Sequence, residues 1–219
     1  MPGGQRAPAR IEIGFEGSAV FPGVLASAIA NYRETRPRTE IRLTELAILT
    51  QMNEIEEGRL DVGIVRLPAD LPSRLTADAI FRDPIILAIP AAHPLTMSRS
   101  VPINQLRREK FVALRSQEDV GFNAQIADLC AEIRLDPHVT QRAGQFTTLI
   151  GLVAGGLGLG FVPSSVRNLR IPDVAYRPLD VSRHSILAMV YRRSERAEAV
   201  LTFIKELRVA AKQAADLCR

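Results

Sequence analysis

The sequence predicts an α/β fold built from two linked halves, and its 219 residues offer three observations in support. Short apolar runs of strand length alternate with segments in which apolar residues recur at helical spacing. Two such series follow one another along the chain, at residues 11–65 and 111–162. A helix that connects two strands forces them to pair in parallel, so each half is expected to contain parallel strands with helix crossovers.

The first series has three predicted strands, at residues 11–15, 41–46 and 61–65. Ser18 follows the first strand and is placed to cap a helix, because its hydroxyl can accept hydrogen bonds from backbone N–H groups one turn on. That helix is expected to start at Ser18 or a few residues later, with an apolar stripe that ends at Tyr32. A second helix is expected from Ile48 to Glu57, and Gly58 is placed to end it.

The rest of the chain is predicted in the same way. A polar loop is expected at residues 67–79, before a longer strand at 83–90. The second series contributes strands at residues 111–114, 139–142 and 157–162, and helices at 122–133 and 146–153. A short helix at Pro163, strands at 174–176 and 185–191, and a long helix follow. Ser194 is placed to cap this final helix. The chain is expected to cross between the halves near Arg82 and Ile186, through a two-strand hinge.

Composition excludes several classes of protein. Apolar residues make up 47% of the chain and charged residues 24%, as in ordinary globular proteins. No apolar run approaches the roughly 20 residues of a membrane span, and the first ten residues show no secretory signal. The net charge is +4 with arginines spread along the chain, so no nucleic-acid-binding stripe is visible. Cys130 and Cys218 are interpreted as reduced thiols, and a cytoplasmic protein without membrane contact is expected.

The search for catalytic, metal and cofactor motifs is negative. His93, His138 and His184 lie far apart, and none has a neighbour at metal-ligand spacing. The serine-nucleophile motif G-x-S-x-G is absent. The glycine run 155–160 follows a helix and precedes a strand, the reverse of a dinucleotide motif, so it is predicted to cap the helix. The sequence therefore predicts no metal, no cofactor and no enzyme.

Two residues indicate a binding site for an acid. Ligands of open α/β sheets lie beyond the carboxyl ends of the strands, where Ser18 and Arg66 both follow predicted strands. A free helix N-terminus beside Ser18 would favour an anion, and Arg66 would add a positive charge. Simple helix capping explains Ser18 equally well, and an ion pair at the surface is the competing role of Arg66.

Several motifs occur in a specific order and spacing. They are Ile13-Gly14-Phe15 with the following Ser18, Tyr32-Arg33 and Pro37, Glu45, residues 58–64 (GRLDVGI), His93-Pro94-Leu95 and residues 151–163 (GLVAGGLGLGFVP). Together they make residues 10–191 resemble the effector-binding domain of LysR-type transcriptional regulators. The subgroup that responds to benzoate, muconate and chlorinated muconates is the most similar.

This resemblance implies a fold like that of type 2 periplasmic binding proteins, with two Rossmann-like subdomains. Residues 10–82 and 187–219 would form regulatory subdomain I, and residues 83–186 would form regulatory subdomain II. A small effector, expected to be an aromatic or unsaturated carboxylate, would bind in the cleft and shift the arrangement of subdomains and oligomer. The resemblance also implies a dimer of this domain, a tetramer of the full-length regulator, and operator DNA bound only through an N-terminal helix-turn-helix, which is expected to be absent from this chain.

The resemblance also implies a set of effector-binding residues. They are Ser18, Ala19, Ile48, Arg66, Val120, Gly121, Phe122, Thr147, Phe161 and Leu187. Ser18 matches a serine that contacts the effector carboxylate, and Phe122 with its neighbours matches a loop that closes on the ligand. Ile48 stands where the subgroup has a threonine that hydrogen-bonds a second carboxylate. A monocarboxylate or a more apolar effector is therefore favoured over a dicarboxylate.

Two other classes share this fold and stay open as alternatives. A solute-binding protein of a transporter would carry a signal peptide, which the sequence does not show. An enzyme, such as a dehydratase or a transferase, would need an acid–base or metal constellation, and none is recognisable. Turnover of a bound compound would favour the enzyme, and a native upstream signal sequence would favour the solute-binding protein.

Overall fold

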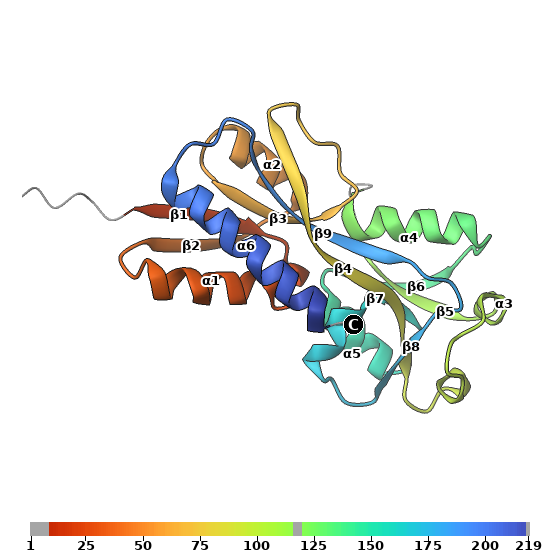
Figure 1. Cartoon of the computed structure of the whole chain (residues 1–219). Helices are drawn as coiled ribbons and strands as arrows, with labels where there is room; N and C mark the ends of the chain where they lie inside the picture. The colour runs from red at the N-terminus through yellow and green to blue at the C-terminus, as the bar shows by residue number, and fades with distance from the viewer. Residues whose placement is uncertain (1–8, 116–119, 218–219) are drawn as a thin grey trace, which may run out of the picture. The chain divides into compact units, whose positions relative to one another are not determined.

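A computed structural model describes residues 9–115 and 120–217 of the chain and divides it into two compact units (Figure 1). Unit 1 consists of Met1–Val65, Asp70–Phe81 and Leu187–Arg219, and unit 2 consists of Arg66–Ala69 and Arg82–Ile186. The chain therefore enters unit 2 briefly at Arg66–Ala69, returns to unit 1, builds most of unit 2 from Arg82 to Ile186, and ends in unit 1. Among the helices of the described residues, none is both long and apolar enough to cross a membrane.

Unit 1 is a sheet with helices packed on both faces. Its strand order is β2-β1-β3-β9-β4, and β1 pairs in parallel with both β2 and β3. The strands are β1 (Arg10–Phe15), β2 (Glu40–Glu45), β3 (Val62–Leu67) and parts of β4 (Leu75–Pro90) and β9 (His184–Arg192). The helices are the 3₁₀ helix η1 (Gly17–Val20), α1 (Val24–Thr35), α2 (Ile48–Glu56) and α6 (Glu198–Leu217).

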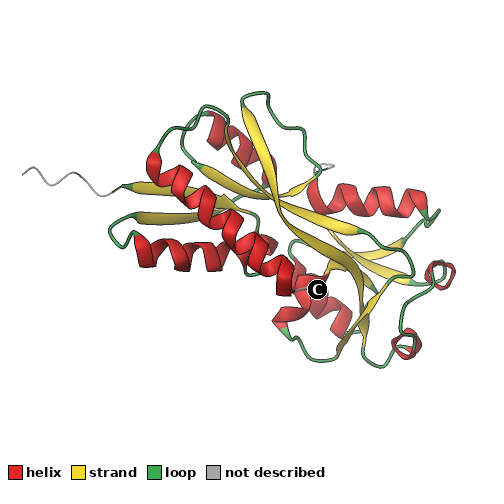
Figure 2. Cartoon of the chain, in the orientation of Figure 1, coloured by secondary structure: helices red, strands yellow, loops and turns green. Residues whose placement is uncertain are grey.

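Helices α1 and α6 lie side by side and cover one face of this sheet (Figure 2). Tyr32 of α1 meets Phe203 of α6 edge to face, with 5.7 Å between the ring centroids. Both rings are almost completely buried in a cluster with Ile11, Ile13 and other sheet residues. Burial of aromatic and aliphatic side chains on this scale is the main force that holds the two helices on the sheet.

Unit 2 contains two groups of strands. Strand β4 pairs antiparallel with β7 and β8, and β5 pairs in parallel with β6. The strands are β5 (Lys110–Leu114), β6 (His138–Ala143), β7 (Gly160–Pro163) and β8 (Val174–Pro178), with parts of β4 and β9. The helices are η2 (Pro94–Met97), α3 (Ile103–Leu106), α4 (Gly121–Glu132), α5 (Phe146–Ala154) and η3 (Ser164–Leu169). The α/β fold with parallel strands and helix crossovers is thus confirmed in both units.

Both predicted serine caps are wrong. Helix α1 begins at Val24 after Gly23, whose φ of 81° is left-handed, and Ser18 lies in the separate turn η1. Helix α6 begins at Glu198. The carboxylate of Glu195 accepts hydrogen bonds there from the backbone N–H groups of Arg196 and Ala197, at 2.9 and 2.8 Å, so Ser194 is not needed.

Two predicted boundaries also move. Residues 67–79 were expected to form a loop, yet β4 already begins at Leu75, so the last five of them are strand. A strand was expected from residue 157, yet β7 begins at Gly160. The prediction that the glycine run caps a helix is confirmed, because α5 ends at Ala154 and Gly156 follows with a φ of 77°.

Cys130 is buried in α4 with a free thiol, whereas Cys218 lies outside the described residues. Burial, with a smaller contribution from the negative charge of Asp136, raises the pKa of the Cys130 thiol to about 11. A thiolate, not a thiol, is the species that attacks disulfide reagents. Cys130 is therefore expected to react at pH 8 about a hundredfold more slowly in the native chain than in the urea-unfolded chain.

Peptide-resolved mass spectrometry after timed labelling would measure both rates, and equal rates would contradict the prediction.

The raised pKa of the Cys130 thiol also makes the free energy of unfolding depend on pH. The neutral thiol is favoured in the folded chain, so its contribution to stability is complete below the unfolded pKa of about 8.5 and is lost as the pH rises toward about 11. The variant Cys130→Ala is expected to remove this part of the alkaline pH dependence.

Candidate functional site

Ser18 lies directly after β1, in a turn that main-chain hydrogen bonds fix within unit 1. Glu16 donates its backbone N–H to Ile64 at 3.1 Å, and the Ala19 N–H donates back to the Glu16 carbonyl at 2.7 Å. The Ser18 side chain is 4% exposed, and its hydroxyl donates to the Glu16 carboxylate at 3.0 Å. Ser18 is therefore placed at the carboxyl end of a parallel strand as predicted, but it meets an acidic side chain there.

Glu45 brings a second carboxylate to the same turn. Glu45 is the last residue of β2, and it lies opposite Phe15 of β1 in the sheet. A Cβ atom placed on Gly17 would lie 2.5 Å from a carboxylate oxygen of Glu45. Glycine is therefore the residue that allows this approach, because any side chain would displace the carboxylate. Sequence reasoning used Glu45 only as part of a family motif and gave it no role.

Ile48 begins α2, and its side chain is buried within unit 1. The loop before it is held by Gln51, whose side-chain amide donates to the Leu46 carbonyl at 2.9 Å. Gln51 is fully buried, and its amide oxygen packs against Gly14 and Gly63 with no hydrogen-bond partner among the described residues. Sequence reasoning missed Gln51. Two glycines in adjacent strands, which leave room for a side chain over the sheet, were the available signal.

Two other predicted residues of unit 1 lie in its core. Ala19 and Leu187 have no solvent exposure and belong to the apolar cluster beneath α1 and α6. Their side chains are surrounded by protein, as core residues are. A direct contact with an effector stays a prediction for both residues.

In unit 2, Phe122 and Phe161 come together in the wall of one small apolar pocket. The pocket has a volume of about 50 Å³, and its walls are Phe111, Val112, Ala113, Leu114, Phe122, Asn123, Ile126, Pro137, Val139 and Phe161. Phe161 stacks on Phe111 with ring centroids 5.4 Å apart, and Phe122 meets Phe146 edge to face at 5.1 Å. This pocket has space for a water molecule or two, whereas an aromatic ring would have to displace side chains.

The remaining predicted residues of unit 2 lie at helix N-termini. Val120 is the half-buried residue before α4, and Gly121 has a φ of 61° and donates its N–H to Pro68 at 2.7 Å. Only glycine adopts that backbone conformation without strain. Thr147 is exposed in the first turn of α5. Val120, Gly121 and Phe122 are therefore consecutive residues at the start of α4.

Arg66 is fully buried in unit 2 and forms an ion pair. Its guanidinium donates to Asp83 at 3.2 Å and to the Ser185 hydroxyl at 3.0 Å. Asp83 is also fully buried and accepts from both the N–H and the hydroxyl of Ser165, at 3.0 and 2.6 Å, and from the Ser164 hydroxyl. The ion-pair role of Arg66 matches this geometry, although the pair is buried and not at the surface. A contact of Arg66 with an effector stays a prediction.

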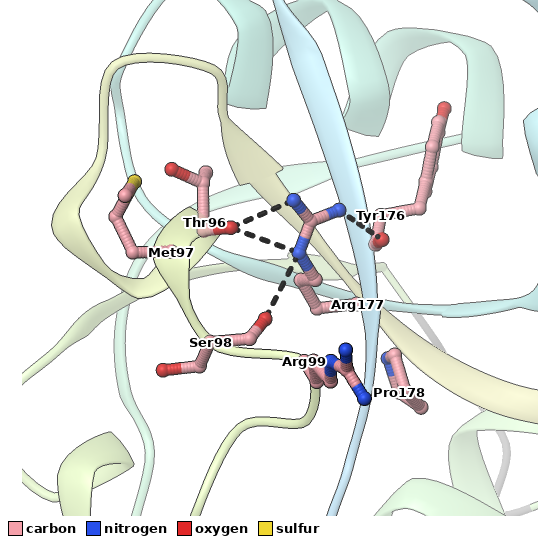
Figure 3. A pocket seen from close by; sticks show the side chains of 7 residues that line it. All are labelled: Thr96, Met97, Ser98, Arg99, Tyr176, Arg177 and Pro178. Carbon is pink, nitrogen blue, oxygen red and sulfur yellow. Dashed lines mark hydrogen bonds between the residues drawn. The ribbon is translucent and has the colours of Figure 1, made fainter.

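A second cavity of unit 2, of about 300 Å³, lies beside β8 and η2 (Figure 3). Arg177 forms part of its wall, and its guanidinium donates to the carbonyls of Thr96, Ser98 and Tyr176 at 2.7 to 3.1 Å. Figure 3 shows the bonds to Thr96 and Ser98 directed at the turn, and the bond to Tyr176 directed at the neighbouring residue of β8. Arg177 thus ties η2 to β8, and this structural role accounts for its position without a ligand.

Residues 9–115 and 120–217 contain no group of three or more His, Cys, Asp or Glu side chains that could hold a metal ion. His93 has a structural role, because its imidazole accepts a hydrogen bond from the Leu95 N–H at the start of η2.

Comparison with known proteins gives one consistent result. The family model described as "LysR substrate binding domain" matches residues 4–212. The regulator AlsR of Bacillus subtilis is 31% identical over 193 residues, which are 88% of this chain and 63% of AlsR. The regulator BenM of Acinetobacter baylyi is 30% identical over 171 residues, or 77% of this chain and 56% of BenM. The chain therefore spans less than two thirds of the length of these relatives.

Solved structures match over nearly the whole chain. The structure of the BenM effector-binding domain with its effector benzoate has a TM-score of 0.86 and 25% identity, and the match covers 96% of this chain and 95% of that one. Full-length CbnR in complex with its target DNA has a TM-score of 0.82 at 17% identity, which is a likeness of fold.

Proposed function

Because this chain belongs to the family of LysR substrate-binding domains, we propose that it senses a small metabolite for a transcriptional regulator. The observation that carries the proposal is its likeness to the BenM effector-binding domain along 96% of its length. AlsR and BenM are named as transcriptional regulators, and their names favour a regulatory over an enzymatic role.

In this proposal, units 1 and 2 are regulatory subdomains I and II. An effector that binds one arrangement of the subdomains better than another shifts the equilibrium between them, by as much as its affinities differ. The full-length regulator would assemble as dimers and tetramers, bind operator DNA through an N-terminal domain, and act in the cytoplasm. These are properties of a regulator about 1.4 times as long as this chain, judged by AlsR.

For the effector site we propose Ser18 and Ile48 in unit 1 and Phe122, Thr147 and Phe161 in unit 2. Buried Ala19, Gly121 and Leu187 would support them. The sequence predicts a small carboxylate, and benzoate is the effector of the BenM domain. Aromatic acids are therefore the first compounds to test for binding, together with neutral and cationic compounds of the same shape.

Isothermal titration calorimetry would test the proposal with benzoate, salicylate, hydroxybenzoates, muconate and aliphatic acids, each beside its amide and its amine or amidine. At least one compound is expected to bind with micromolar affinity and to raise the melting temperature of the chain. The variant Ser18→Ala should weaken that binding about tenfold, since it removes a polar contact. Ser27→Ala, an exposed serine of α1, is the matched control and should bind normally.

Two results would contradict the proposal. The first is that no compound binds and the melting temperature never changes. The second is that a bound compound is consumed, because turnover would favour an enzyme on this fold.

A further inference from the structure

The cavity beside β8 and η2 has positive and apolar side chains in its wall, and no acidic one (Figure 3). Its walls come from residues 96–99 and 176–178, all of which belong to unit 2. One compact body therefore forms the whole cavity. Its volume of about 300 Å³ lies at the lower end of the range of small-molecule pockets.

Carbonyl oxygens hold the Arg177 side chain in place but leave its charge without a counter-ion. Nε donates to the carbonyls of Thr96 and Ser98, Nη2 to that of Thr96, and Nη1 to that of Tyr176. One further N–H group on each of Nη1 and Nη2 has no partner among the described residues. Arg177 is also absent from the ion pairs of the described chain. Two N–H donors and a positive charge are thus held at the cavity for a ligand.

Arg99 brings a second positive charge to the same cavity. Its side chain is exposed and forms no hydrogen bond or ion pair within residues 9–115 and 120–217. Asp180 follows two residues after Pro178 but does not line the cavity, and its carboxylate accepts from the Ile103 N–H at 3.3 Å. An anion bound between the two guanidinium groups would lower their mutual repulsion.

We propose that this cavity binds the phosphate group of a small phosphorylated metabolite, with Arg99 and Arg177 as its positive partners. A phosphate monoester carries a charge of about −1.5 to −2 at pH 7 and has three acceptor oxygens. These properties match two guanidinium groups, which bind phosphate oxygens through paired N–H donors. Met97 and Pro178 supply apolar surface for the organic part of the ligand. The effector site proposed above uses none of these residues, so the two proposals stand or fall separately.

Titration of the chain with inorganic phosphate, followed by ¹H–¹⁵N NMR spectra, tests the proposal. Phosphate is expected to bind with a Kd on the order of 1 mM and to shift the amide signals of residues 96–99, 176 and 177. Acetate at the same ionic strength should bind several-fold more weakly, because it has one negative charge. Phenyl phosphate should bind more tightly than inorganic phosphate, since its ring can cover the apolar part of the wall.

The variant Arg99→Gln removes one of the two charges and keeps a side chain of similar polarity. It is expected to weaken phosphate binding about tenfold. Its fold should be unchanged, because Arg99 makes no bond to the rest of the described chain. Arg33→Gln is the matched control, since Arg33 is an exposed arginine of α1 that also forms no ion pair among the described residues. Arg33→Gln should bind phosphate normally.

Met97 offers a second test that leaves both arginines in place. Its side chain is 90% exposed, so a polar replacement disturbs no core. Met97→Glu adds a negative charge to the wall and is expected to weaken phosphate binding about tenfold. Met97→Gln has nearly the same size without the charge, and its affinity should stay within about twofold of the original chain.

Three results would overturn the proposal. The first is that phosphate causes no saturable shift of the amide signals of residues 96–99, 176 and 177. The second is that acetate binds there as tightly as phosphate, because a preference for a dianion would then be absent. The third is an equal loss of affinity in Arg99→Gln and Arg33→Gln, which would show that the general surface charge of the chain attracts the ion.

Discussion

The variant Asp83→Ala is expected to lose about 3–5 kcal/mol of unfolding free energy, the largest effect that we predict for a single charged residue of this chain. Asp83 and Arg66 are both fully buried, and their side chains are 3.2 Å apart. Removing the carboxylate takes away the buried counter-charge that Asp83 supplies to the Arg66 guanidinium, and it removes the acceptor that Asp83 provides to Ser164 and Ser165. Urea denaturation followed by circular dichroism measures the loss.

The double variant Arg66→Met with Asp83→Leu is the control. It removes both charges together, and a buried ion pair replaced by apolar residues of similar volume is often neutral for stability. The double variant is therefore expected to be more stable than Asp83→Ala alone. A double variant that is less stable than Asp83→Ala would contradict the unpaired-charge account, because both variants lose the hydrogen bonds of Ser164 and Ser165 to Asp83 alike.

The variant Gly158→Ala is expected to lose about 3 kcal/mol, for two reasons that add. Gly158 has a φ of 150°, a conformation that residues with a side chain rarely adopt. A Cβ atom there would also lie 2.6 Å from the carbonyl oxygen of Lys110, which is main chain and cannot rotate away. This close approach lets Leu159 exchange hydrogen bonds of 2.8 Å with Lys110 and Val112 of β5.

Two other glycines of the same segment serve as controls. Gly156 has a φ of 77° but open space around a Cβ atom, so Gly156→Ala should show the backbone strain alone, about 1 kcal/mol. Gly151 lies inside α5 with open space and ordinary backbone angles, so Gly151→Ala should stabilise the chain by about 0.5–1 kcal/mol. The melting temperature is expected to be highest for Gly151→Ala, lower for Gly156→Ala and lowest for Gly158→Ala. Any other order would contradict this account.

Periodicity predicted most of the fold because the elements concerned are long and buried on one side. Helix α2 is expected from Ile48 to Glu57 and observed from Ile48 to Glu56, with Met52 and Ile55 buried as their spacing requires. Gly58 follows with a φ of 75°. The parallel pairing of β1 with β2 and β3 follows from the helix crossovers between them.

The caps could not be predicted because they depend on competition between nearby polar groups. Ser18 and Ser194 have the residue type of a cap, but Ser18 donates to Glu16, and Glu195 supplies the acceptor at the start of α6. Local sequence shows which groups are able to form a hydrogen bond. It does not show which partner a group takes in the folded chain.

The places of the candidate residues in the fold were easier to predict than the groups that they contact. Ser18 and Phe122 lie at the carboxyl end of a strand and at the start of a helix, as the βα pattern requires. The partners of Arg66 are 17 and 119 residues away along the chain, and Glu45 approaches Gly17 only after β1 and β2 have paired. The charge around a residue depends on such distant neighbours, so it could not be derived from motifs alone.

The discontinuous path of unit 1 has a consequence for how the chain is made. Unit 2 is complete once Ile186 has left the ribosome, whereas the core of unit 1 still lacks Phe203 and the rest of α6. At about 5–20 residues per second, unit 2 has a head start of a few seconds or less. During that interval the apolar face of α1 has no cover from α6. Translation thus imposes an order in which the inserted unit finishes first, and the nascent unit 1 is the part of the chain that a chaperone would meet with an open core.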